Sequence, residues 1–101
     1  MKVEQFYNKN QFIINGKDDI YFQSYQSTIA RIDSNGILTL GIDWDYSRTT
    51  MKHLYLFLSD YYFNINKDFK LYIHEVLSSN NKKKALQKLI DNKIIEVKEE
   101  L

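Results

Sequence analysis

The spacing of apolar residues along the chain changes once, from about two residues before Trp44 to about 3.6 residues after it. A spacing of two is typical of a strand with one buried face, and a spacing of 3.6 is typical of a helix with one buried stripe. The stretch from Trp44 to Leu58 contains this change and the only tryptophan. The pattern predicts an α+β fold, in which an N-terminal antiparallel sheet of about four strands packs on two to three C-terminal helices.

Short apolar runs separated by turn residues predict the strands, at residues 12–14, 20–25, 28–32 and 37–42. Residues 16–19 follow an asparagine and form the first predicted turn. For the last hairpin we favour a three-residue loop at residues 34–36 with a left-handed glycine. That loop sets Ile32 opposite Leu38 and gives the hairpin one apolar face, whereas a two-residue loop would put apolar residues on both faces. Residues 1–10 are predicted as a short helix or an ordered arm.

Three helices are predicted after Trp44. The first begins near Ser47 or Thr49, either of which offers a hydroxyl to cap it, and it carries an apolar stripe at Leu54, Phe57 and Leu58. Helices over residues 67–77 and 82–91 follow, separated by a polar turn. Residues 94–97 return as a short strand or extend the last helix. Trp44 is predicted to be at least half buried where the sheet passes into the first helix.

Composition limits the protein class. The 101 residues suit one domain spanning residues 1–101, and the net charge of +1 does not favour a general nucleic-acid binder. The lack of cysteine excludes disulfides and thiolate chemistry. The longest apolar run, residues 54–58, is too short to cross a bilayer, and the first residues lack a signal-peptide pattern. We therefore expect a cytoplasmic protein without a membrane partner.

The nearest approach to a catalytic or metal-binding set is Asp43, Asp45 and His53. Carboxylates and imidazole are metal ligands, but aspartates before a helix also favour its positive end, and that second interpretation is preferred. Nucleophile triads, phosphate loops and zinc-ligand spacings are not found in the sequence. The sequence therefore predicts a protein that is not an enzyme and needs neither cofactor nor metal.

Two basic patches and a row of tyrosines are the candidate partner-binding residues. The patches are Arg48 with Lys52, and Lys82, Lys83, Lys84 and Lys88; the tyrosines are Tyr55, Tyr62 and Tyr72. Lysines on an amphipathic helix are usually its solvated face, and such tyrosines are usually the rim of a core. The functional alternatives are a phosphate-contacting surface and a protein interface.

Two segments together resemble a known family. These are Ser24-Tyr25-Gln26-Ser27-Thr28-Ile29-Ala30 and, after a glycine-centred hairpin, Trp44-Asp45-Tyr46-Ser47-Arg48-Thr49-Thr50-Met51-Lys52-His53-Leu54. They resemble a widespread family of small proteins from phages, plasmids and conjugative elements. Its recurring core is Ser-Tyr-x-Thr, a β-hairpin, then Tyr-Ser-x-Thr-Thr-x-x-His and an apolar helix. The similarity covers residues 11–58.

The resemblance implies a phage or mobile-element protein inside a bacterial cell. Small binding proteins in that setting often inhibit host defence. The leading expectation is therefore an inhibitor of a CRISPR-Cas or other defence nuclease, such as an anti-CRISPR protein, that acts by occluding a host protein. The alternative is a nucleic-acid-binding regulator that uses the basic patch at residues 82–93. The oligomeric state is left open.

The motif residues themselves are interpreted as structural: a helix cap, a buried tyrosine hydroxyl and a packed histidine. They are Trp44, Tyr46, Ser47, Thr49, Thr50 and His53.

Overall fold

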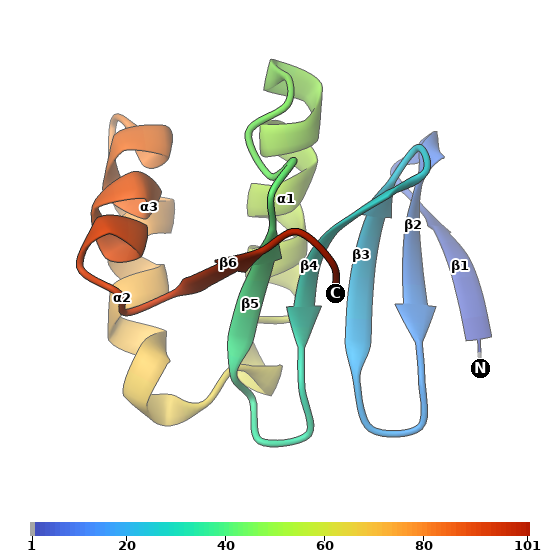
Figure 1. The fold of residues 1–101 in the computed structure, drawn as a ribbon, viewed down its shortest axis with the longest axis horizontal. Coiled ribbons are helices and arrows are strands. Elements are labelled where there is room, and N and C mark those ends of the chain that lie inside the picture. Colours follow the sequence, from blue (N-terminus) through green and yellow to red (C-terminus); the bar gives the residue numbers. More distant parts are fainter. Residues whose placement is uncertain (1) are drawn as a thin grey trace.

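One sheet backed by three helices makes up the fold (Figure 1). The computed structural model describes residues 2–101 and every side chain among them except those of Asn8 and Lys9. The strands are β1 (Lys2–Phe6), β2 (Asn8–Asn15), β3 (Ile20–Ser24), β4 (Ser27–Ile32), β5 (Leu38–Gly41) and β6 (Glu96–Lys98). The helical elements are α1 (Arg48–Asp60), the 3-10 turn η1 (Tyr62–Asn64), α2 (Lys67–Ser78) and α3 (Lys82–Asp91). The predicted α+β class is confirmed.

The strands lie side by side in chain order. Neighbours from β1 to β5 are antiparallel, whereas β6 is parallel to β5. The chain reaches β6 only after α2 and α3, and so the helices form the crossover that a parallel pair needs. For residues 94–97 the sequence allows either a short strand or an extension of the last helix. The structure has a strand there, β6, and Ile95 just before it is buried.

Residues 2–10 belong to the antiparallel hairpin of β1 and β2, and the expectation of a short helix or an arm for this segment is wrong. Met1, the remaining residue of that predicted segment, lies outside the described residues. The strand pattern is hidden because β1 is an edge strand whose first four residues are exposed, and only Phe6 enters the core. The turn is made at Tyr7, which has a left-handed φ of 59° where a glycine or asparagine would have been a signal.

The β4–β5 hairpin has the predicted register. Ile32 pairs with Leu38, and Gly36 is left-handed at a φ of 78°. The Asp33 carboxylate holds the loop, because its Oδ1 accepts hydrogen bonds from the backbone N–H of Asn35 (2.9 Å) and of Ile37 (3.0 Å). The predicted register puts Arg31 and Thr39 on the face opposite to Ile32 and Leu38. Thr39 is nevertheless buried, since β5 lies between two neighbouring strands.

The core forms between the sheet and α1, which lies behind the strands in Figure 1. Leu54, Phe57 and Leu58, the predicted stripe, are fully buried. The ring of Phe57 stacks on that of Phe22 from β3 at a centroid distance of 5.6 Å. Trp44 is only 4% exposed, which confirms its predicted burial. Within residues 2–101, no helix is long and apolar enough to cross a membrane.

Candidate binding site

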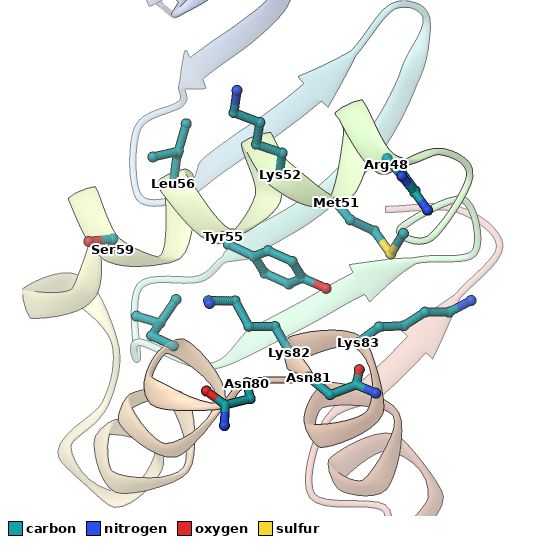
Figure 2. A pocket seen from close by; sticks show the side chains of 11 residues that line it. Arg48, Met51, Lys52, Tyr55, Leu56, Ser59, Asn80, Asn81, Lys82 and Lys83 are labelled. Atoms are coloured by element: carbon teal, nitrogen blue, oxygen red, sulfur yellow. The ribbon is translucent and has the colours of Figure 1, made fainter.

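A groove between α1 and the start of α3 brings the first predicted basic patch together with two lysines of the second (Figure 2). Its volume is about 630 Å³. Four cations line it: Arg48 and Lys52 from α1, and Lys82 and Lys83 from α3. Its apolar lining comes from Met51, Tyr55, Leu56 and Leu77. In Figure 2 the Tyr55 ring reaches from α1 towards α3, while the Lys52 side chain extends from α1 away from α3. We call this feature the basic groove.

Side-chain caps fix where the two helices begin and thereby place the cations. Ser47 Oγ accepts a hydrogen bond from the Thr50 backbone N–H at 3.1 Å, so α1 starts at Arg48. Asn81 Oδ1 accepts from the Lys84 backbone N–H at 3.1 Å, so α3 starts at Lys82. Of the two caps considered for α1, Ser47 is the one used. The first residue of each helix, Arg48 in α1 and Lys82 in α3, is therefore a cation that lines the basic groove.

The electrostatics of these helix starts are locally unfavourable. A helix N-terminus carries partial positive charge and favours Asp or Glu in its first turn, yet α1 and α3 have no acidic residue there. No carboxylate lines the basic groove, and within residues 2–101 none lies within 4.0 Å of its four cations. Lys82 Nζ instead donates to the Ser79 carbonyl at 3.4 Å. The basic groove is thus suited to an anionic group supplied from outside.

The hydroxyl of Tyr55 lies in this environment without a partner. The oxygen is buried and makes no hydrogen bond among the described residues. Burial, and secondarily the nearby Asp45 carboxylate, raises the pKa of Tyr55 above its ordinary value of 10.0. The hydroxyl therefore stays neutral at physiological pH and keeps a free proton to donate.

Four candidate partner-binding residues lie outside the basic groove: Tyr62, Tyr72, Lys84 and Lys88. Tyr62 is used internally, because its hydroxyl donates to the Lys70 carbonyl at 3.1 Å and the Lys70 ammonium lies 5.7 Å from its ring centroid. The other three are exposed on α2 and α3. The structure therefore unites five of the nine candidates: Arg48, Lys52, Tyr55, Lys82 and Lys83.

The structural interpretation of the motif holds for some of its residues and is wrong for one. Thr50 is buried, and its hydroxyl lies 3.0 Å from that of Ser47. His53 is buried, and its Nδ1–H donates to the Thr49 carbonyl at 2.9 Å. The predicted buried hydroxyl of Tyr46 is not found, because this side chain is 78% exposed. Tyr46 precedes the helix in a turn that directs its ring to solvent.

Asp43, Asp45 and His53 do not form a metal centre. No three His, Asp or Glu side chains in the described part of the chain are placed to hold an ion together. Asp43 Oδ2 accepts a hydrogen bond from Ser27 Oγ at 3.2 Å, and the His53 ring bonds to its own helix.

A second hollow was not predicted. It lies between the β3–β4 turn and the segment that leads into α1, has a volume of about 660 Å³, and is lined by Tyr25, Asp43 and Tyr46 among others. The sequence contained a signal for this hollow, because the two segments that carry the family resemblance are the ones that line it. We call it the tyrosine hollow.

Comparison with known proteins places the chain in a family. The model of a family of unknown function, DUF8033, matches residues 1–72. No curated protein and no solved structure matches the chain. The tyrosine hollow lies entirely within the matched residues, whereas the α3 side of the basic groove lies outside them.

Proposed function

We propose that this chain, which belongs to DUF8033, a family of unknown function, is a non-enzymatic binding protein that inhibits a host defence nuclease by covering part of its surface. In this proposal the chain is encoded by a phage or other mobile element and acts in the cytoplasm of the bacterial host. The partner is a CRISPR-Cas effector or another defence nuclease. The setting follows from the family resemblance, and the contact surface is the basic groove.

One observation carries the choice of surface. Arg48 and Lys82 open their helices, where a cation costs stability, and the two helix starts border the same groove. Departures from local rules are expected at functional sites. The apolar lining adds Met51 and Tyr55, residue types enriched in protein interfaces. A protein surface that presents carboxylates around an apolar side chain would complement this groove.

A matched pair of charge reversals tests the proposal. The groove variant is Arg48→Glu with Lys82→Glu. The control is Lys67→Glu with Lys84→Glu, which changes net charge equally in the first turns of α2 and α3 but outside the basic groove. None of the four changes should unfold the chain, because each puts an acid where the helix dipole favours one.

The readouts are capture from host lysate by the tagged protein and nuclease interference in cells. We expect the wild type and the control to retain a defence nuclease subunit and to reduce interference, and the groove variant to do neither. Failure of the wild type to recover any nuclease subunit, with interference unchanged, would rule the proposal out.

The second candidate function is nucleic-acid-binding regulation through the same groove. The absence of a carboxylate from its lining favours this function, while the net charge of +1 does not. Four cations that contact phosphates would give a slope of roughly −3 to −4 for log K against log salt. Titration of single- and double-stranded probes over a salt series measures it, and no binding at low salt removes this candidate.

A further inference from the structure

The tyrosine hollow presents two large aromatic side chains to solvent. Tyr25 is 56% exposed and Tyr46 is 78% exposed, and both line the same depression. Neither makes a side-chain hydrogen bond or a ring contact within the described residues. Exposed tyrosines that neither pack nor bond contribute little to the fold, yet they are among the side chains that contribute most at protein interfaces.

The backbone at Tyr25 supports a role beyond folding. Tyr25 occupies the turn between β3 and β4 with a left-handed φ of 54°, a conformation that favours glycine or asparagine and is rare for a bulky residue. Its backbone N–H donates to the Asn10 carbonyl at 2.7 Å, which holds this conformation. The chain thus has an aromatic side chain at a position where glycine or asparagine would adopt the backbone conformation at lower cost.

The charges around the hollow are of one sign. Asp43 lies between the tyrosine hollow and a second depression, which is also lined by Glu99 and Glu100. No lysine or arginine lines either depression. The only side-chain partner of the Asp43 carboxylate in the described residues is the neutral hydroxyl of Ser27. Its negative charge is therefore available to a ligand.

We infer that the tyrosine hollow binds a cationic side chain, arginine or lysine, presented by a partner protein. A guanidinium or ammonium group is attracted to the face of a tyrosine ring and pairs with a carboxylate. The hollow offers two such rings beside one carboxylate that has no cationic partner among the described residues. It shares no lining residue with the basic groove, and its charge is opposite. The protein thus has two separate binding surfaces of opposite charge, which can serve one partner or two.

The test uses the full ¹⁵N-labelled chain and two peptide probes. The first is a glycine–serine peptide with two arginines, and the second has citrulline, the neutral isostere, in place of arginine. The arginine probe should shift the backbone amides of residues 24–27 and 43–49, and the citrulline probe should leave them in place. Equal shifts with both probes, or arginine-probe shifts confined to other acidic surfaces, would overturn the inference.

Two variants test the geometry. Tyr46→Ala should weaken binding of the arginine probe by roughly two- to five-fold, which corresponds to an exposed cation–π contact. Asp43→Asn should weaken it by a similar factor at low salt. The matched control is Phe63→Ala, which removes an 85% exposed ring away from the hollow and should bind like the wild type. Unchanged affinity in Tyr46→Ala and Asp43→Asn would contradict the assignment.

Discussion

Tyr55 and Tyr62 lie on the same stripe of the hydrophobic pattern, but their hydroxyls differ in environment. That of Tyr55 is buried without a partner, and that of Tyr62 donates to the Lys70 carbonyl. Removal of a buried hydroxyl without a partner relieves a desolvation cost, whereas removal of a bonded one loses about 0.5–1.5 kcal/mol. We expect Tyr55→Phe to maintain or raise the free energy of unfolding and Tyr62→Phe to lower it. Guanidinium unfolding curves measure both, and a loss in Tyr55→Phe as large as in Tyr62→Phe would contradict the assignment.

The same hydroxyl makes stability depend on alkaline pH. Burial and then Asp45 raise the pKa of Tyr55 above 10.0 in the folded chain, so folding favours the neutral hydroxyl. The contribution of this group is fully present below the unfolded pKa and is lost as pH rises through the folded one. Tyr55→Phe cannot ionise, and its stability relative to the wild type should therefore increase as the pH passes about 10. Urea unfolding on both sides of that pH tests this, and a constant difference would contradict it.

Ser47 caps α1, whereas Thr49, two residues further on, is exposed within the first turn. Loss of a serine cap costs about 1 kcal/mol, which for a chain of this size lowers the melting temperature by roughly 4–8 °C. We expect that shift in Ser47→Ala and nearly none in Thr49→Ala, measured by circular dichroism. Equal melting temperatures for the two variants would mean that the hydroxyl of Ser47 is not the stabilising cap.

Sequence reasoning at the residue scale succeeded where burial follows from hydrophobicity alone. Trp44 and the stripe at Leu54 and Phe57 are buried as predicted. It was wrong for Tyr46 because a tyrosine suits both a core rim and solvent, and the turn before α1 decides between them. The hydroxyl pattern narrowed the cap to two residues, but only the backbone conformation selects Ser47.

At the scale of elements, the β4–β5 loop joins the sheet to the start of α2. The Gly36 carbonyl accepts a hydrogen bond from the Asn66 N–H at 2.8 Å, and a Cβ on Gly36 would lie 2.5 Å from that nitrogen. The left-handed backbone alone costs an alanine ~1–2 kcal/mol, and this contact adds to the cost. Gly36→Ala should therefore lower the unfolding free energy by at least ~2 kcal/mol.

Gly16→Ala is the matched control for that prediction. A Cβ there would be 3.4 Å from its nearest neighbour, the Asp19 carbonyl oxygen, which is an ordinary contact. The change should stay within about 0.5 kcal/mol. Chemical denaturation of both variants tests the pair, and similar losses would show that the position of Gly36 against α2 is not what matters.

The β4–β5 and β1–β2 hairpins show when the hydrophobic pattern is enough to predict strand pairing. The register of β4 and β5 was predictable because one pairing buries Ile32 and Leu38 together while the alternative does not. The β1–β2 hairpin was missed because an edge strand exposes most of its residues and leaves no alternation to detect. Its turn also uses a left-handed tyrosine in place of the usual glycine or asparagine.

At the scale of the molecule, function depends on contacts that no local pattern records. Lys52 and Lys82 are 30 positions apart, and only the fold, in which the start of α3 lies across a groove from α1, brings both to one site. The sequence could supply the candidates but not the distance between them. The family match divides the two surfaces, since it includes the tyrosine hollow and ends before α3. The α1 side of the basic groove lies within the matched residues, and its α3 side lies beyond them.

The last 21 residues nevertheless belong to the fold. Residues 81–101 supply the buried side chains Leu86, Leu89 and Ile95, and β6 covers the edge of β5. Burial of three such side chains contributes ~5–9 kcal/mol, which is comparable to the whole stability of a small domain.

A chain cut to residues 1–80 should therefore lack a cooperative thermal transition and self-associate through its open β5 edge. A chain cut after Lys98, which loses only the three terminal residues, should melt cooperatively as a monomer. Thermal melts and size-exclusion chromatography distinguish the two chains. A cooperative, monomeric chain of residues 1–80 would mean that the fold does not need residues 81–101 and that α3 serves only the basic groove.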